Sequence, residues 1–276
     1  MTVQVISVAH RKGGVGKTTT TIHLATGLAD LGVPTIAIDL DPQGNLGQFL
    51  GLGAAPDVYD LLMSRHPGRI LSQTLARVAG YPKLAVIRSD DETKAAERAL
   101  SDPQSSRPLS AALQAILDAI ERQSNGTRVF VFLDTPPGLG SLQLAALTVS
   151  HYLIIPVNPS YASETGLPKI GEEIQTIRQR TGRGARLLGI LPTRYKRRAL
   201  EHQDVLDDLR KTFGENLLYP PIRDTVRLEE TPGRGVPVWG YDPTGIGAQD
   251  YARVLARLAR DLGIRVNGNG KGRRGG

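Results

Sequence analysis

Short apolar runs alternate along this chain with longer segments in which apolar residues recur every three or four positions. The runs predict strands at Val3–Ala9, Thr35–Asp39, Leu84–Ile87, Arg128–Asp134, Tyr152–Pro156 and Arg186–Leu191. The segments predict helices at Lys17–Leu31, Leu109–Gln123 and Gln249–Leu262. Residues 129–133 are all apolar, which is typical of a parallel strand covered on both faces. The pattern therefore predicts an α/β fold, a doubly wound, mostly parallel central sheet with helices on both faces.

The 276 residues contain no repeat and no internal linker that would divide two domains. We therefore expect a single domain over residues 1–266. Residues 267–276 are rich in glycine and arginine with nothing to bury, and we expect a mobile tail there. The chain has neither an apolar run long enough to span a membrane nor a signal-peptide pattern, so we expect a cytoplasmic protein.

The composition narrows the possible chemistry. The chain has no cysteine, which excludes a disulfide framework, a thiolate nucleophile and any cysteine-based metal site. Its 34 Lys and Arg outnumber 27 Asp and Glu, giving a formal net charge of +7. This balance makes a polyanion or an anionic surface a candidate partner.

A glycine-rich loop follows the first predicted strand and opens the first predicted helix. The expected phosphate-binding residues are Lys12, Gly13, Gly14, Val15, Gly16, Lys17, Thr18 and Thr19. In such a loop the backbone N–H groups converge on phosphate oxygens, Lys17 neutralises the β and γ phosphates, and the Thr18 hydroxyl binds Mg²⁺. The alternative is a glycine-rich turn with an ordinary helix cap, which the Gly-Lys-Thr sequence in this context disfavours.

The loop departs from the ordinary phosphate-loop pattern, because Arg11 stands where a glycine is usual and Lys12 precedes Gly13. Its sequence from Lys12 to Thr18 resembles the deviant Walker A motif, KGGxGK[ST], of the ParA and MinD ATPases. The resemblance implies a P-loop NTPase fold, ATP and Mg²⁺ as ligands, and an ATP-dependent homodimer in which Lys12 reaches the partner's nucleotide. Such a lysine would act as a catalytic cation supplied in trans. Without the motif, Lys12 would be interpreted as a solvated loop lysine.

Three aspartates follow the ends of predicted strands. Asp39 ends the second strand, Asp41 comes two residues later, and Asp134 ends the strand over 128–134. Ligands bind beyond the carboxyl ends of parallel strands, so we expect the three to converge, with Asp39 and Asp134 near the metal. If Asp39 and Asp41 both lay in regular strand, they would share one face. The resemblance implies that Asp41 positions the attacking water. Strand-end caps and a turn at Asp41 are the structural alternatives.

The resemblance extends along nearly the whole chain. Further stretches in ParA-type order and spacing are 134–137, 155–157, 164–166, 226–228 and 235–243. Two stretches depart from it: His10-Arg11 stands where Asn-Gln is common, and Ile222-Arg223-Asp224 stands where the family commonly has Ile-Pro-Arg near adenine.

Between residues 174 and 200 the chain has basic residues and no acidic ones. The basic residues are Arg178, Arg180, Arg183, Arg186, Arg194, Lys196, Arg197 and Arg198. A charge run is often only a solvated surface, but it also suits salt-sensitive binding of DNA without sequence preference. The resemblance places two DNA-contacting arginines of the family on Arg198 and Arg227. We expect Arg194, Lys196, Arg197, Arg198 and Arg227 to contact DNA.

These features predict a DNA-partitioning ATPase that is nucleoid-associated in the cytoplasm. Mg-ATP would drive a dimer that binds DNA nonspecifically, and a ParB-like centromere-binding partner would stimulate slow hydrolysis. One alternative is a MinD-like membrane-associated ATPase, because Tyr251, Leu255, Leu258 and Leu262 form an apolar stripe. We favour a helix packed on the sheet and expect no stable membrane binding. A second alternative keeps ParA chemistry but positions a protein cargo on the nucleoid.

Overall fold

The computed structural model describes residues 2–53, 56–101, 108–160 and 185–264, together with Gln175 and Gln179. The strands are β1 Val3–Val8, β2 Thr35–Asp39, β3 Ala76–Val78, β4 Tyr81–Ile87, β5 Val129–Asp134, β6 Tyr152–Val157 and β7 Arg186–Pro192. The described helices are α1 Lys17–Asp30, α2 Asn45–Phe49, α3 Val58–Met63, α4 Pro67–Thr74, α5 Thr93–Ser101, α6 Leu109–Gln123, α7 Ser141–Val149, α10 Leu200–Phe213, α11 Val226–Arg234, α12 Val238–Tyr241 and α13 Ile246–Asp261. A single 3₁₀ turn, η1, covers Glu215–Leu217. The predicted tail at 267–276 lies outside the described residues.

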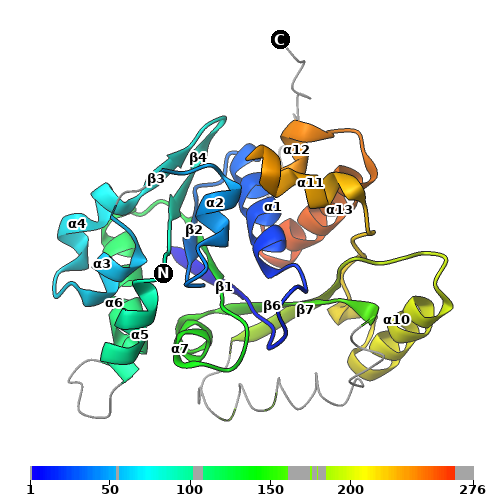
Figure 1. The fold of residues 1–276 in the computed structure, drawn as a ribbon, viewed down its shortest axis with the longest axis horizontal. Coiled ribbons are helices and arrows are strands. Elements are labelled where there is room, and N and C mark those ends of the chain that lie inside the picture. Colours follow the sequence, from blue (N-terminus) through cyan, green and yellow to red (C-terminus); the bar gives the residue numbers. More distant parts are fainter. Residues whose placement is uncertain are drawn as a thin grey trace.

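The described strands form one sheet in the order β3-β4-β2-β5-β1-β6-β7. All neighbouring strands are parallel except the edge pair β3 and β4. The helices group on the two sides of this sheet, with α3 to α6 on one side and α1, α11, α12 and α13 on the other (Figure 1). The predicted doubly wound α/β fold is therefore confirmed.

Alternating side chains of the central strands explain the two covered faces. In β5, Phe130 and Phe132 join the core with α1 and α13, whereas Val129, Val131 and Leu133 join the core with α3 to α7. Successive strand residues point to opposite faces, so an all-apolar strand needs a helical layer on each side. A third cluster packs α10 against β6 and β7.

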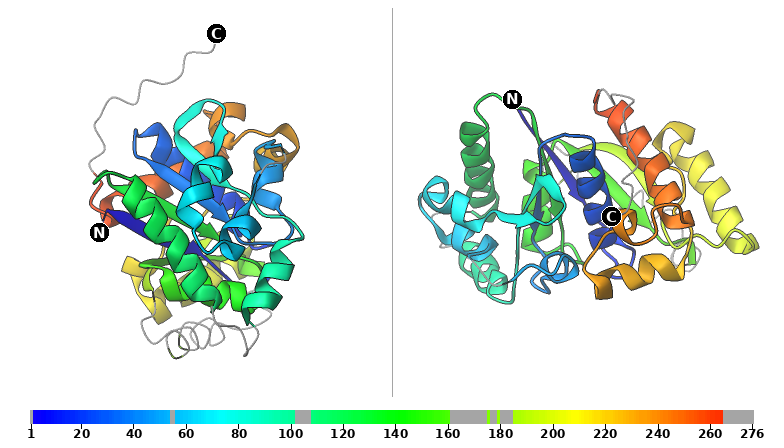
Figure 2. Two further views of the ribbon diagram at one scale, coloured as in Figure 1. Left: turned by 90° about the vertical axis from the view of Figure 1, so that its left-hand side faces the viewer. Right: turned by 90° about the horizontal axis from the view of Figure 1, so that it is seen from above.

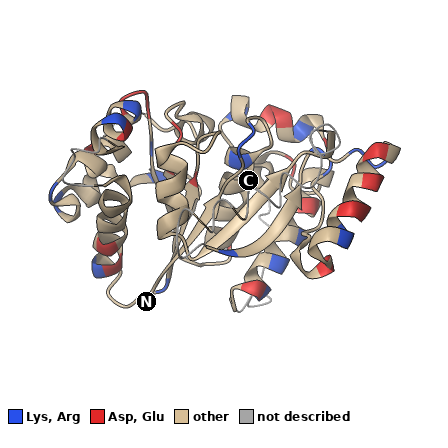
Figure 3. Ribbon diagram, turned by 90° about the horizontal axis from the view of Figure 1, so that it is seen from below, with Lys and Arg blue, Asp and Glu red and all other residues tan. Residues whose placement is uncertain are grey.

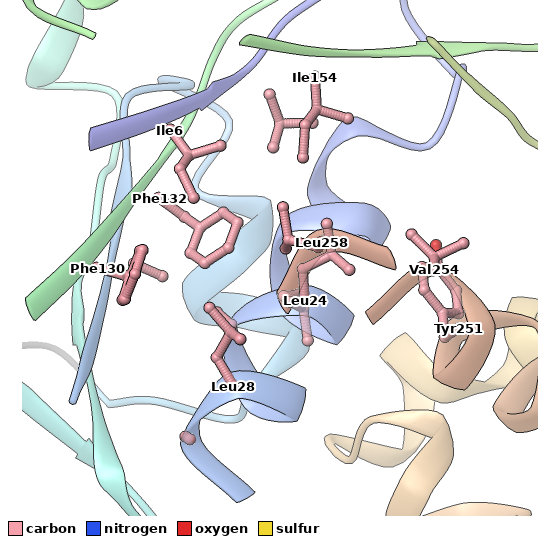
Figure 4. Packing of buried hydrophobic residues seen from close by; sticks show 14 of the residues in the cluster. Ile6, Leu24, Leu28, Phe130, Phe132, Ile154, Tyr251, Val254 and Leu258 are labelled. Carbon is pink, nitrogen blue, oxygen red and sulfur yellow. The ribbon is translucent and has the colours of Figure 1, made fainter. Parts of the chain in front are cut away.

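Helix α13 lies beside α1, although the two are far apart in sequence (Figure 2). Its residues Tyr251, Val254 and Leu258 are buried against the α1 side of the sheet (Figure 4). A side chain on Gly27 of α1 would come within 2.7 Å of Leu255, so glycine permits this close packing. The predicted packing of this helix within the fold is confirmed, and no described helix is long and apolar enough to cross a membrane.

Hydrogen bonds also fasten α1 to the C-terminal helices. His23 of α1 stacks on Tyr251 with ring centroids 4.4 Å apart, and its Nε2 accepts from the backbone N–H of Val238 at 3.0 Å. The indole N–H of Trp239 donates to the Thr26 hydroxyl at 3.0 Å. Burial lowers the pKa of His23 to about 4, so its ring is neutral at pH 7 and accepts this bond. The position of α1, the helix that follows the glycine-rich loop, is therefore fixed by contacts with α12 and α13.

Candidate active site

Residues 9–16 connect the end of β1 to the start of α1 as a tight loop. Gly14 and Gly16 have φ values of 74° and 83°, in the left-handed region where a side chain is strained. Gly16 is the N-cap of α1, and its carbonyl oxygen accepts from the backbone N–H of Thr20 at 2.9 Å. The glycines thus turn the chain directly into a helix N-terminus, the backbone arrangement that binds anions.

Two neighbouring segments hold this loop in place. The Thr193 hydroxyl, just after β7, donates to the carbonyl oxygen of Val15 at 2.8 Å. The N–H of Gly138, after β5, donates to the carbonyl oxygen of Arg11 at 2.7 Å. The loop conformation is therefore built by the sheet edge as well as by its own glycines.

The lysines of the loop differ in their burial. Lys17 is buried, with 7% of its surface exposed, and its ammonium donates to the Lys12 carbonyl oxygen at 3.1 Å. Lys12 is half-buried, and its backbone N–H donates to Nδ1 of His10 at 2.9 Å. Burial, reinforced by the charges of Lys17, Lys12 and Arg11, lowers the pKa of His10 to about 4. His10 is therefore neutral and accepts a hydrogen bond within the loop. The positive charge of the loop comes from the lysines.

Asp39 organises the loop that follows β2. Its side chain is fully buried, and its two oxygens accept from the N–H groups of Asp41 at 2.9 Å and Leu46 at 3.1 Å. Burial and the nearby charge of Asp134 raise the pKa of Asp39 well above its usual range. Asp39 thus makes the contacts of a strand-end cap, which was the structural alternative to a metal-binding role. It also lies at the carboxyl edge of the sheet, where the sequence predicted that metal-binding role.

Asp41 lies beyond the last residue of β2, so it and Asp39 do not share a face of regular strand. Its Oδ1 accepts from the N–H of Gln43 at 3.0 Å, which forms a turn. The backbone still pairs with β5 one residue beyond the strand, where the N–H of Leu40 donates to the carbonyl oxygen of Asp134 at 2.9 Å. Asp41 is thereby held on a short loop at the carboxyl edge of the sheet.

Asp134 is paired with Asp39 across neighbouring parallel strands. Its Oδ1 accepts from the Thr21 hydroxyl at 3.3 Å, and the Thr18 side chain lies close to this carboxyl group. Burial, with a smaller contribution from Asp41, raises the pKa of Asp134 to about 7. Its Oδ2 is buried without a hydrogen-bond partner among the described residues. A buried oxygen without a partner, close to a threonine hydroxyl, suits a hydrated divalent cation.

No cluster of three or more His, Asp or Glu within the described ranges could hold a metal ion by itself. A cation at this edge would need Thr18, water and oxygen atoms from a ligand. This requirement agrees with the donor set of phosphate-loop proteins, in which protein side chains supply few of the metal's ligands.

A pocket of about 200 Å³ opens beside the start of α1. Its lining residues are Gly16, Thr19, Thr193, Arg194, Ile222, Arg223, Asp224, Thr225, Leu228, Glu229, Pro232 and Tyr251. Gly16 and Thr19 place the pocket next to the phosphate loop. Sequence reasoning missed the contribution of Thr193 and Tyr251, since neither stands in a local motif.

The basic residues between 174 and 200 do not form one surface. Arg186 begins β7, whereas Arg194 and Arg198 follow its other end. Arg194 lines the pocket and is 3.6 Å from Glu229, and Lys196 is 3.8 Å from Asp224. Among the described residues, this basic run is therefore divided between the two ends of β7; Arg178, Arg180 and Arg183 lie outside the described residues.

Exposed arginines nevertheless remain near the end of β7. Arg197 and Arg198 are exposed, and the exposed Arg227 bonds to Glu230 and Tyr241. The next helix, α10, carries four acidic residues, and Figure 3 shows acidic and basic residues interspersed on this side of the molecule. Of the residues predicted to contact DNA, Lys196, Arg197, Arg198 and Arg227 are thus exposed and outside the pocket lining, although Asp224 lies beside Lys196.

The comparisons with known proteins agree with this geometry. A family model described as an AAA domain matches residues 3–185. The chromosome partitioning protein ParA of Caulobacter vibrioides is 34% identical over 263 residues, which cover 94% of each chain. This chain belongs to the ParA family of partitioning ATPases.

Of two further matches, one is another partitioning ATPase and the other is a nucleotide-bound structure with the same fold. The chromosome-partitioning ATPase Soj of Thermus thermophilus is 35% identical over 260 residues, covering 93% of this chain and 97% of Soj. The structure of cobyrinic acid a,c-diamide synthase from Mycobacterium smegmatis, with an ATP analog and magnesium bound, has a TM-score of 0.75 and 28% identity. That match covers 96% of this chain and 98% of the synthase.

Proposed function

We propose that this chain is a partitioning ATPase whose Mg-ATP-bound form dimerises, binds DNA without sequence preference and is reset by a partner-stimulated hydrolysis. The observation that carries the nucleotide chemistry is the buried Lys17, in a loop with two left-handed glycines, together with Asp134 Oδ2, which has no hydrogen-bond partner among the described residues. Family membership and the nucleotide-bound M. smegmatis relative support ATP and Mg²⁺ as ligands.

Each proposed step uses residues of this chain. The N–H groups of residues 13–19 and the Lys17 ammonium bind the phosphates. Mg²⁺, held through Thr18 and through water on Asp134 and Asp39, would offset the negative charge on the phosphate oxygens. Asp41, at the adjacent loop, would orient the attacking water. Phosphoryl transfer to water needs positioning and charge stabilisation and no nucleophilic side chain.

Lys12 supplies the proposed link between hydrolysis and dimerisation. Its backbone carbonyl oxygen accepts a hydrogen bond from Lys17 of the same chain, and Lys12 itself is half-buried. A cation that reaches a second copy's nucleotide stabilises charge there only in the dimer. We propose this role for Lys12.

The DNA-binding step rests on the exposed arginines Arg197, Arg198 and Arg227. Arginine is always charged and can donate two hydrogen bonds to one phosphate, which suits backbone contacts without base readout. Arg194 and Lys196 are assigned weaker roles in this proposal, because the carboxylates of Glu229 and Asp224 lie beside them. Arg227 likewise has Glu230 beside it at 3.1 Å, so Arg197 and Arg198 are assigned the larger share of the contact. A ParB-like protein is the proposed partner, since ParA and Soj are the relatives.

The MinD-like alternative needs an apolar helix face that is free to enter a membrane surface. In α13 that face is buried in the core with α1, so it is not available for insertion while the domain is folded. The protein-cargo alternative shares all of the proposed nucleotide chemistry. A gene for a ParB-like protein beside the gene for this chain would favour DNA as the cargo.

The decisive experiment measures binding to random-sequence duplex DNA with Mg-ATP, with Mg-ADP and without nucleotide, each over a salt series. Binding should require ATP and fall steeply with salt, because released counterions drive it. Equal binding in all three states would contradict the ATP switch. Sedimentation with anionic liposomes in the absence of DNA would favour the membrane alternative instead.

A further inference from the structure

The wall of the pocket opposite the phosphate loop is fixed by backbone pairing. The N–H of Tyr195 donates to Ile222 at 2.9 Å, and the N–H of Asp224 donates back to Tyr195 at 3.0 Å. Arg223 therefore sits between two residues that are tied to the segment after β7. These backbone hydrogen bonds on either side of Arg223 fix its main chain without any contribution from its side chain.

The Arg223 side chain is held in turn by Asp250 of α13. Its Nε donates to Asp250 Oδ2 at 2.9 Å and its Nη2 donates to Oδ1 at 2.6 Å. The backbone N–H of Arg223 adds a third contact to the same carboxylate at 2.9 Å. The Asp250 side chain is 0% exposed, whereas that of Arg223 is 30% exposed. A planar guanidinium bound on two nitrogens to a buried carboxylate has almost no rotational freedom.

One nitrogen of this fixed guanidinium is left over. Among the described residues, no atom accepts a hydrogen bond from Nη1 of Arg223, and Arg223 is one of the residues that line the pocket. Asp250 also accepts a hydrogen bond from Arg253, whose side chain is 57% exposed. Arg253 does not line the pocket. Arg223 and Arg253 thus share one carboxylate, but the pocket wall includes Arg223 alone of the two.

The pocket lies where the base and sugar of a nucleotide would extend from phosphates bound at Gly16 and Lys17; this step rests on the proposed function. A donor held rigidly on the wall loses little entropy when it binds, so it contributes more to affinity than a mobile side chain. Acceptors available on that half of ATP are the ring nitrogens of the base and the oxygens of the ribose.

We propose that Arg223, positioned by Asp250, binds the base and sugar half of ATP by donating a hydrogen bond from its guanidinium to an acceptor there. Arg223 is then a binding residue of the site, and Asp250 is a positioning residue that acts through it. Neither belongs to the phosphate loop or to the strand-end aspartates.

The test compares Mg-ATP with inorganic triphosphate, which carries no base or sugar, by calorimetric titration. In Arg223→Ala the dissociation constant for ATP should rise about tenfold or more, the usual effect of losing a charge-assisted hydrogen bond. Triphosphate should bind the variant and the natural chain alike, which also shows that the loop remains folded. Arg253→Ala is the matched control, since it removes the other arginine from Asp250, and it should leave ATP affinity within about twofold.

A double-variant cycle tests the role of Asp250. Asp250→Asn should weaken ATP binding in the natural chain and have no further effect when Arg223 is already alanine. An effect of the same size in both backgrounds would mean that Asp250 acts on the fold and not through Arg223. With the natural chain, 7-deaza-ATP tests N7 of the base as the acceptor and 2′-deoxy-ATP tests the 2′-hydroxyl of the ribose.

The outcomes separate this inference from the proposed function. If the natural chain binds neither triphosphate nor ATP, both are overturned. If it binds both ligands and Arg223→Ala keeps its ATP affinity, the inference is overturned and the proposed function stands. A weaker affinity of Arg223→Ala for ATP, with unchanged affinity for triphosphate, supports the inference.

Discussion

The ammonium nitrogen of Lys17 lies 3.1 Å from the backbone carbonyl oxygen of Lys12, to which it donates a hydrogen bond. The two lysines of the loop are thus linked through the backbone of one and the side chain of the other. Shortening the Lys12 side chain leaves this bond in place, so the roles of the two lysines can be separated by substitution.

Lys12→Ala should bind Mg-ATP with nearly natural affinity but fail to dimerise, and its hydrolysis rate should fall by about a thousandfold, as when a cation is withheld in trans. Dimer formation is measured by light scattering with ATP present, and hydrolysis by phosphate release. Arg11→Ala, which removes the neighbouring exposed cation, is the control and should dimerise. A Lys12→Ala variant that still forms the ATP dimer would contradict the trans role.

Asp41→Asn tests whether a carboxylate is needed for hydrolysis. Asparagine can still accept from the N–H of Gln43, so the turn survives while the charge is lost. ATP binding and dimerisation should persist, and the hydrolysis rate should fall by about a hundredfold or more. Asp41→Ala removes the turn contact as well and serves as the comparison. Natural hydrolysis in Asp41→Asn would show that the residue is only a turn former.

Arg198→Glu should abolish ATP-dependent DNA binding without preventing dimerisation, because it places a negative charge against the phosphate backbone. Arg186→Glu is the matched control: it comes from the same basic run, but it lies at the opposite end of β7. For Arg198→Ala, the slope of log affinity against log salt should fall by about one phosphate contact. Equal losses in the Arg186 and Arg198 variants would indicate a general charge effect rather than a binding surface.

The raised pKa of Asp57 makes the free energy of unfolding depend on pH. Burial, followed by the charge of Asp90, raises its pKa from 3.8 to about 6, so the folded state holds this proton more tightly than the unfolded chain does. The free energy of unfolding should therefore fall between about pH 4 and pH 6 as the group ionises. Asp57→Asn keeps the cap on Tyr59 and should remove part of this fall, about 1–2 kcal/mol. Chemical denaturation at pH 4.5 and 7.5 measures it; an unchanged pH dependence would contradict the assignment.

Contiguous patterns were predicted well. The apolar run at residues 129–133 indicated a doubly covered strand, and Lys17 to Leu31 indicated the helix after the loop, which ends at Asp30. The three-residue strand β3 was missed because Ala76–Val78 is too short to show alternation. Helix α13 begins at Ile246, earlier than predicted, because Gly245 and Gly247 resemble a loop in sequence although both lie at a tightly packed helix start.

Contacts between distant residues were beyond sequence reasoning. Nothing near Val15 indicates that the Thr193 hydroxyl will hold it, and nothing near Arg223 indicates that Asp250 will bind it. The basic run shows the same limit: Glu229, more than thirty positions further along, lies beside Arg194 and offsets its charge. Sequence composition counts charges, whereas the fold decides which of them face each other.

The bond from Trp239 to Thr26 has a practical consequence. The chain has one tryptophan, and its indole is fastened to the helix that begins at Lys17. Tryptophan emission is sensitive to the hydrogen bonding of its indole and reports, without any label, on one defined place in the molecule. The protein carries in α12 an intrinsic optical probe that is hydrogen-bonded to the helix proposed to receive the phosphates.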